Sequence, residues 1–318
     1  GVAFHSYESY LGKLIRAGYK VAIWEQTETP EAAKKRAREN KGQTALVTRD
    51  VIRIVTAGTL VEDHLLDARE NNYLAALTEV GGQYGLSWLE LSTGEFRVQP
   101  VAEGQIGAAL QRIGASEILM PDRLTRLEGL HDTVQSFQHR VTPRPSSLFD
   151  SVNAQRRLEA TFGVGTLDSF GGFSRAEIAA AGALIDYLDL TQKGNLPRFA
   201  PPQQVHDGQI MEIDAATRRN LELTRTLTGE RAGSLLSVID RTVTGAGARA
   251  LQARLSAPLR DLEVIKQRHD DIESLITESR LREGLQKAQS TSAEIHNMLG
   301  GSFKQLNSEF GFSLQAPK

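Results

Sequence analysis

The spacing of apolar residues predicts a small α/β segment at the start of the chain. Apolar side chains recur at the i, i+3, i+4, i+7 and i+8 positions of one buried helix face, at Tyr7, Tyr10, Leu11, Leu14 and Ile15. Strand patterns follow at residues 19–24 and 51–55, with a polar stretch between them. One helix and two strands hold too little core to fold alone. We therefore expect this segment to need further sequence.

The next segment has the pattern of a mixed sheet flanked by helices. Apolar runs predict strands at residues 73–80, 84–91, 95–101 and 117–120. The dipeptide Gly81-Gly82 predicts a hairpin between the first two strands. Residues 106–113 have helical periodicity. Strands in a row, followed by alternating helix and strand, favour a mixed sheet covered by helices.

A long helix and a break follow this sheet. Ser174 and Glu177 form a capping-box pattern at the start of a helix predicted over residues 174–190. Glycine and proline then interrupt the pattern at residues 193–202. These residues end helices and favour turns, so they predict a domain boundary there.

From Asp214 onward the pattern is almost wholly helical. Asp214 is expected to cap a helix that carries Leu221 and Leu223. Asp261 is expected to open another helix, whose apolar face comprises Leu262, Ile265, His269, Ile272, Leu275 and Ile276. We expect His269 to be packed on that face or to serve in a cap, in preference to acting as a ligand. Long helices with short breaks favour a helical bundle or lever.

Composition narrows the class of protein. The chain has 318 residues, 40% of them hydrophobic, and a formal charge of −2. It has no cysteine, which excludes disulfides and thiolate-bound metals. Without a long apolar run or a signal peptide, a soluble cytoplasmic protein with no membrane partner is expected. Residues 1–56 carry a charge of +4 and the remainder −6, so a nucleic-acid-facing surface is expected in the first segment.

Few residues suggest chemistry. The only Gly-Lys pair, Gly12-Lys13, lacks the phosphate-loop pattern, and no two histidines have zinc-ligand spacing. The run from Lys34 to Lys41 could contact phosphates or form a solvated, mobile loop, and Arg49 and Arg53 could contact phosphates or simply lie on the surface. A group of acidic residues could hold Mg²⁺ in a nuclease, or could serve only in turns and caps: Glu90, Asp122, Asp150 and Asp168.

Five blocks of sequence, in order and with matching spacing, resemble the bacterial MutS mismatch-repair ATPase family. The first block is Gly1-Val2-Ala3-Phe4-His5, and the others lie within residues 10–26, 51–76, 211–223 and 242–261. The family usually has Cys at the position of Trp24 and Pro at the position of Ala57. The resemblance covers residues 1 to about 280.

The resemblance implies an architecture of α/β segments followed by an all-α one. Residues 1–56 would be the C-terminal part of the mismatch-binding domain, residues 57–69 a linker, and residues 70–192 an RNase H-like mixed-sheet connector. Residues 193–318 would begin the helical core or lever domain, with a poorly matching tail from about Ser290. In the full-length family the cofactors are ATP and Mg²⁺. The partners are mismatched double-stranded DNA, a second copy of the protein and a repair factor of the MutL type.

The resemblance also provides candidate residues. By the resemblance, His5 and Arg49 fall in segments near the DNA-facing side of the family. Asp214, Arg218 and Arg219 fall in the most distinctive block, where helix capping and interhelical ion pairing in the lever are the structural interpretation. Signal transmission is the functional interpretation of these three residues. No catalytic, cofactor-binding or metal-binding residue is predicted.

Several parts of the family are not found in this sequence, namely the Phe-x-Glu mismatch-reading motif, the clamp, the ATPase domain and the dimerising C-terminus. We therefore expect a fragment of an ATP-dependent mismatched-DNA-binding protein that itself lacks ATPase activity. It would be cytoplasmic, and associated with the nucleoid when bound to DNA. Two alternatives remain open: an RNase H-like metal-dependent nuclease centred on Glu90, and a non-catalytic module that docks a partner repair protein.

Overall fold

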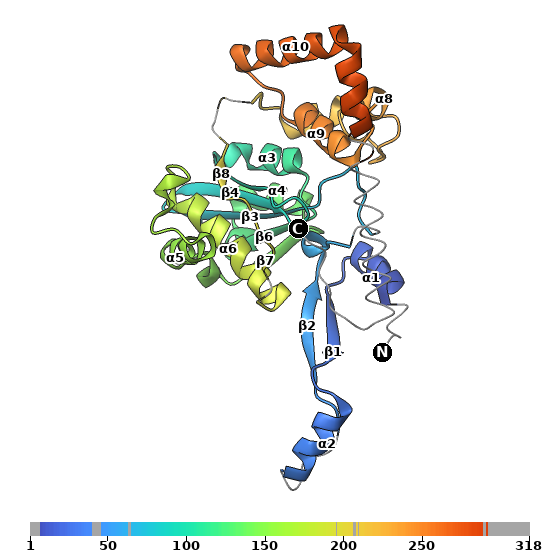
Figure 1. Cartoon of the computed structure of the whole chain (residues 1–318). Coiled ribbons are helices and arrows are strands. Elements are labelled where there is room, and N and C mark those ends of the chain that lie inside the picture. The colour runs from blue at the N-terminus through green and yellow to red at the C-terminus, as the bar shows by residue number, and fades with distance from the viewer. Residues whose placement is uncertain are drawn as a thin grey trace. The chain divides into compact units, whose positions relative to one another are not determined.

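The computed structural model has two compact units (Figure 1). Unit 1 comprises residues 1–67 and 72–207, and unit 2 comprises residues 68–71 and 208–318. Mixed α/β segments are followed by a helical one, which confirms the predicted fold class. The residues described by the structure are 7–39, 46–62, 65–194, 196–205, 208, 210–288 and 291.

Unit 1 begins with a helix and a two-stranded ribbon. The elements are α1 (Tyr7–Arg16), β1 (Val21–Gln26), α2 (Pro30–Glu39) and β2 (Arg49–Val55). The strands β1 and β2 are antiparallel, with an irregularity in register at Ile23 and Trp24. Helix α2 lies beyond the far end of this ribbon (Figure 1).

Helix α1 buries only part of its predicted apolar face. Leu11 and Ile15 are buried against Val55 and the following turn. Tyr10 and Leu14, in contrast, are 50% and 40% exposed, so their predicted burial is wrong. A two-stranded ribbon offers a single narrow face, which covers one stripe of a helix and leaves its flanks in solvent.

The polar stretch that was interpreted as a mobile loop is helical over residues 30–39, as helix α2. The Thr29 hydroxyl accepts a hydrogen bond from the amide of Ala32 at 3.2 Å, and Pro30 occupies the first helical position. A threonine cap followed by proline and an alanine-rich run is a helix-start signal. The sequence therefore contained the information that the loop interpretation overlooked. Residues 40–45 of the stretch lie outside the described residues.

A six-stranded sheet forms the body of unit 1, in the order β7-β6-β3-β4-β5-β8. Strands β3, β4 and β5 are antiparallel neighbours, whereas β6, β7 and β8 join in parallel. The strands are β3 (Tyr73–Val80), β4 (Gln83–Glu90), β5 (Phe96–Val101), β6 (Glu117–Pro121), β7 (Val141–Arg144) and β8 (Gln203–Gln204). The predicted Gly81-Gly82 hairpin and mixed sheet are confirmed. Because β8 pairs with β5, unit 1 continues beyond the break at residues 193–202.

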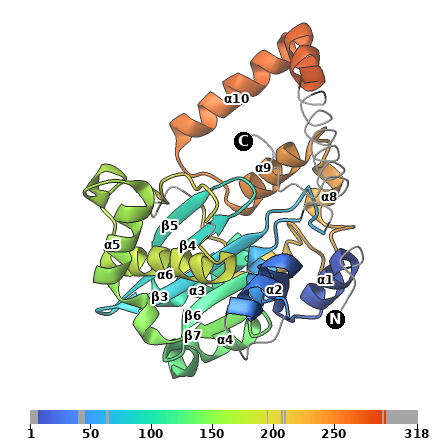
Figure 2. The same cartoon turned by 60° about the horizontal axis from the view of Figure 1, so that its bottom comes forward.

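Helices cover both faces of the sheet, as Figure 2 shows for α6. Along β3, Leu74 and Ala76 face α5 and α6, while Ala75 and Leu77 face α3. Both sets are fully buried, as expected when alternate residues point to opposite covered faces. The helices are α3 (Ile106–Ile113), α4 (His131–Ser136), α5 (Ser151–Phe162) and α6 (Arg175–Gln192). The predicted capping box of Ser174 and Glu177 is present at the start of α6.

The described residues of unit 2 are mainly helical. The helices include α7 (Ala215–Asn220), α8 (Leu235–Ile239), α9 (Gly245–Ser256) and α10 (Leu262–Thr277). Residues 279–288 are also helical. Asp261 caps α10 as predicted, and its carboxylate accepts hydrogen bonds from the amides of Glu263 and Val264. In the described part of the chain, every helix is too short or too polar to cross a lipid bilayer.

Two expectations for this unit are wrong. The helix that follows Asp214 ends at Asn220, so Leu221 lies outside it and is 53% exposed, while Leu223 is buried after the helix has ended. Helix α10 has no buried residue, and His269 on its apolar face is exposed. Periodicity marks the face of a helix that is suited to packing, but burial also requires a neighbour to cover it.

Candidate functional site

A buried carboxylate lies where the first segment of unit 1 meets the sheet. Glu117, the first residue of β6, is 3% exposed. Its Oε2 accepts hydrogen bonds from the Thr56 hydroxyl at 2.5 Å and from the Gly58 amide at 3.2 Å. A Cβ on Gly58 would lie 2.8 Å from the Cβ of Glu117, so this close approach requires glycine. The chain just after β2 is therefore attached to the sheet.

The second oxygen of Glu117 collects three further donors. Its Oε1 accepts hydrogen bonds from the Thr142 hydroxyl at 2.7 Å and the Tyr187 hydroxyl at 2.8 Å. Lys20 Nζ lies 3.3 Å from the same oxygen and also donates to Thr142. Burial, followed by the charge of Glu117, raises the pKa of Tyr187. A buried carboxylate is stable only when it is hydrogen-bonded and paired, and these donors together with Lys20 meet that requirement for Glu117.

A small cavity of about 50 Å³ adjoins this network. Its lining includes Lys20, Glu117, His139 and Arg140. Pockets for nucleotides and other small ligands are of the order of 300–1,000 Å³, so this cavity is large enough only for water. The arrangement around Glu117 is therefore a structural joint.

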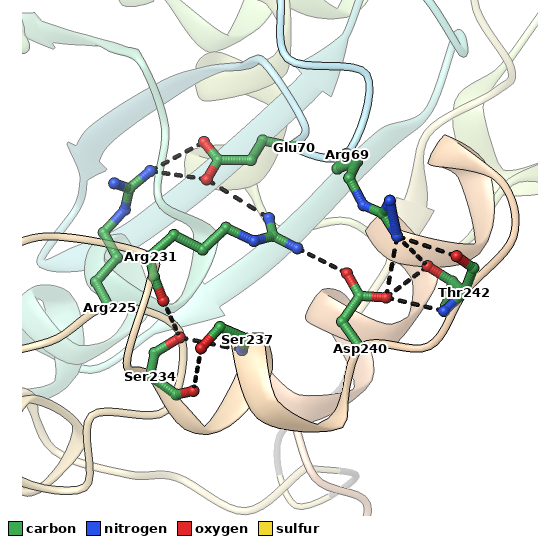
Figure 3. Close-up of polar contacts among 8 residues, drawn as sticks. All are labelled: Arg69, Glu70, Arg225, Arg231, Ser234, Ser237, Asp240 and Thr242. Carbon is green, nitrogen blue, oxygen red and sulfur yellow. Dashed lines mark hydrogen bonds and ion pairs between the residues drawn. The ribbon is translucent and has the colours of Figure 1, made fainter.

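A second joint holds residues 68–71 within unit 2, as Figure 3 shows. Arg69 Nη2 lies 3.3 Å from Asp240 Oδ1 and donates to the carbonyl and hydroxyl oxygens of Thr242, both at 3.0 Å. Asp240 Oδ2 accepts a hydrogen bond from Arg231 at 2.9 Å. The Thr242 hydroxyl, then its amide, and then Arg69 lower the pKa of Asp240 to about 2. Asp240 is consequently ionised at neutral pH between two guanidinium groups.

Glu70 extends this joint on its other side. Both of its carboxylate oxygens accept hydrogen bonds from Arg225 Nη2 at 2.9 Å, and Arg231 Nη1 lies 3.7 Å from its Oε1. The backbone oxygen of Ala68 accepts a hydrogen bond from Arg249 at 2.6 Å. Partners more than 150 residues apart in sequence thus hold this four-residue segment, and no local pattern reveals such pairs.

The ribbon of unit 1 carries one of the two residues predicted to lie near DNA. Arg49 is exposed at the start of β2, opposite Gln26 and at the end of the ribbon next to α2. Glu28 connects α2 to β2, because its Oε1 accepts hydrogen bonds from Arg36 at 2.7 Å and from the Thr48 amide at 2.6 Å. Arg36 and then Thr48 lower the pKa of Glu28 to about 2. His5, the other predicted residue, lies outside the described residues.

The three candidates of the distinctive block occupy different environments. Asp214 is the N-cap of α7, where its carboxylate accepts hydrogen bonds from the Thr217 amide at 2.9 Å and hydroxyl at 2.6 Å. Arg219 is exposed. Arg218 is buried, and no side-chain hydrogen bond or ion pair joins it to any described residue. A role for the three in transmission stays a prediction.

The acidic residues considered for a nuclease have separate structural roles. Glu90 accepts hydrogen bonds from the Ser92 hydroxyl and the Thr93 amide in the turn after β4. Asp150 caps α5, and Asp122 accepts hydrogen bonds from Ser146 and Arg123. Within the described ranges, no group of three or more histidine or acidic side chains is placed to hold a metal ion. The nuclease hypothesis therefore has no support.

The fold is that of a multidomain protein with two compact units. The first joint holds residues 56–58 in unit 1, and the second holds residues 68–71 in unit 2. Family profiles match this chain in three successive parts: MutS domain I at residues 1–64, MutS domain II at residues 72–200, and MutS domain III at residues 216–307. The third match continues beyond Ser290, where the tail was expected to match poorly.

Curated relatives agree with the profiles. The DNA mismatch repair protein MutS of Ruegeria pomeroyi is 48% identical over 303 residues, which are 94% of this chain and 33% of the relative. That of Cereibacter sphaeroides is 49% identical over 90% of this chain and 31% of the relative. That of Paracoccus denitrificans is 47% identical over 94% of this chain and 33% of the relative. The chain belongs to the MutS family, and it spans about a third of the length of these relatives.

Proposed function

We propose that this chain is part of an ATP-dependent protein that binds mismatched double-stranded DNA and acts in DNA mismatch repair. The observation that carries the proposal is the 48% identity, over 94% of the chain, to a protein named DNA mismatch repair protein MutS. No observation favours the alternative of a module that only docks a partner.

The proposal assigns a role to each segment. Residues 1–56 contribute to the mismatch-binding domain, residues 57–69 link it to the connector at residues 70–192, and residues 193–318 begin the core or lever domain. The two joints support this arrangement, because Glu117 holds the chain after β2 within unit 1, and Asp240 holds Arg69 within unit 2. A connecting segment attached at both ends can pass a displacement on, whereas a flexible one would absorb it.

Other functions of the full-length protein are assigned to the two thirds of the relatives' length that this chain does not span. The chain has no phosphate-loop motif, and its described acidic residues form no metal cluster, so these residues do not fit ATP or Mg²⁺. Dimerisation with a second copy and contact with a MutL-type factor are likewise proposed for the longer protein. Arg49 and His5 would contribute to the DNA-facing side. The protein would be cytoplasmic, and associated with the nucleoid when bound to DNA.

Complementation tests the function directly. The longer protein that contains this chain is produced in a bacterium from which the resident MutS protein has been deleted, and the mutation rate is measured. We expect the rate to fall toward that of the parent strain. A folded protein that leaves the rate unchanged, and binds mismatched and matched duplexes equally in anisotropy titrations, would contradict the proposal.

A further inference from the structure

A buried cation in unit 2 has no partner among the residues that the structure describes. Arg218, on α7, is 7% exposed, and its Nε is buried without a hydrogen-bond acceptor. No ion pair or hydrogen bond joins its guanidinium group to any described residue. Burial lowers its pKa, and no neighbouring charge contributes to that shift. An arginine does not escape this cost by deprotonation, because its pKa stays far above neutral.

Four acidic side chains of the same unit are engaged elsewhere. The carboxylate of Asp214 accepts two hydrogen bonds from Thr217 at the start of α7. Glu222 accepts a hydrogen bond from the Leu227 amide at 2.6 Å. Glu70 and Asp240, the acidic members of the second joint, bind other arginines. None of these four carboxylates binds Arg218.

The arginines of the second joint, in contrast to Arg218, each have a carboxylate partner. Arg231, whose side chain is 23% exposed, lies 2.9 Å from Asp240 and 3.7 Å from Glu70. Arg69 and Arg225, which are more exposed, each have a carboxylate within 3.3 Å. Of these four arginines, the most deeply buried, Arg218, is therefore the one without a carboxylate partner among the described residues. Buried charges in proteins are normally paired, so an anion is expected at Arg218.

The same unit presents a surface to be covered. Helix α10 has no buried residue, and its Leu262, Ile272 and Ile276 are 68%, 50% and 66% exposed. Helices of this length depend on tertiary packing for most of their stability in water. The relatives are about three times as long as the chain, so they contain ample polypeptide to pack on this unit.

We propose that Arg218 receives an ion pair from a carboxylate of the longer MutS polypeptide, in a segment outside this third that packs on the helical unit. The inference rests on the proposed function only in assuming that longer protein. A carboxylate on a packing helix can reach a guanidinium that is 7% exposed, whereas a DNA phosphate would need a solvent-facing one.

The first test uses the 318-residue chain with the substitution Arg218→Met. Methionine fills a similar volume without charge, and replacing a buried charge in this way is often neutral or stabilising. The Tm of the helical unit is taken from the far-UV circular-dichroism transition that tryptophan fluorescence does not show, because both tryptophans lie in unit 1. We expect it to be unchanged or to rise by up to about 8 °C. Arg219→Met, at the exposed neighbour, is the control and should not change it. A fall in Tm for Arg218→Met alone would show that the chain already contains the partner, and would overturn the proposal.

The second test uses the longer protein with the same pair of substitutions. In the longer protein, Arg218→Met would leave the partner carboxylate buried and unpaired. The Tm of the longer protein should therefore fall by about 4 °C or more. Hydrogen exchange at the α7 amides should increase in parallel, and Arg218→Lys should restore part of the protection. An unchanged Tm and unchanged exchange would overturn the proposal. Both measurements are independent of DNA repair, so failed complementation with the expected stability pattern would reject only the proposed function.

Discussion

At the scale of single residues, the Glu117 carboxylate determines how the first segment is held. It accepts hydrogen bonds from Thr56, Gly58, Thr142 and Tyr187. An acidic residue at the start of an otherwise apolar strand was the one available signal, but its partners come from segments 25 to 70 residues away. A sequence pattern indicates that such a residue is unusual, and only the fold identifies its donors.

Glu117→Gln should destabilise unit 1 by about 2–3 kcal/mol, because a neutral amide accepts these hydrogen bonds less strongly and places an NH₂ group against donors. Urea denaturation followed by tryptophan fluorescence measures the change. Glu103→Gln, at an exposed position, is the matched control and should change the free energy of unfolding by less than about 0.5 kcal/mol. Equal effects of the two substitutions would contradict the importance of the joint.

The Asp240 joint should make unit 2 sensitive to acid. The pKa of Asp240 is lowered in the folded state from 3.8 to about 2. Its contribution to stability is therefore present above about pH 4 and is lost as the pH falls toward 2. Asp240→Asn should lower the free energy of unfolding of unit 2 at neutral pH. It should also reduce the change of that free energy with pH between about pH 4 and pH 2. Urea denaturation followed by circular dichroism measures both effects. Asp261→Asn, at an exposed helix cap, is the comparison, and an equally flat profile there would refute the assignment.

At the scale of elements, helix α6 organises unit 1. Twelve of its 18 residues are buried, and its capping box starts it at a defined residue. The helix approaches β4 so closely that a Cβ on Gly85 would overlap the backbone of Ala176 and Glu177. The capping box could be predicted because it lies within four successive residues. The close approach could not, since a glycine in a strand has several explanations.

Gly85→Ala should therefore destabilise unit 1 by about 3 kcal/mol or more, because the strand and the helix must move apart along their length. Thermal unfolding monitored by tryptophan fluorescence gives the effect. Gly104→Ala is the control, since a Cβ there meets no atom within 4 Å and the backbone is not left-handed. If both variants unfold at the same temperature, the contact does not constrain the packing.

At the scale of the whole molecule, each unit has its own polar joint. Residues 56–58 belong to the network of unit 1, and residues 68–71 belong to that of unit 2. Both tryptophans, Trp24 and Trp88, lie in unit 1, and Trp88 is buried. Tryptophan fluorescence consequently reports on unit 1, while far-UV circular dichroism reports on the helices of both units.

We expect the two signals to give different unfolding transitions, because the chain divides into two compact units. Gly85→Ala should shift the fluorescence transition alone, and Asp240→Asn should shift only the additional transition seen by circular dichroism. The double variant should show the sum of the two effects to within about 0.5 kcal/mol. Coincident transitions that shift together in every variant would show that the two units unfold as one.

The sequence by itself determined the order of elements, the fold class and the family, because these depend on local periodicity, caps and blocks of residues that are read along the chain. The tertiary structure decided which apolar faces are covered, as the exposed Tyr10 and His269 show. It also decided which charges are paired: Glu117 and Asp240 are, whereas Arg218 has no partner among the described residues. Burial and pairing depend on neighbours brought together by folding, and sequence separation carries no information about that proximity.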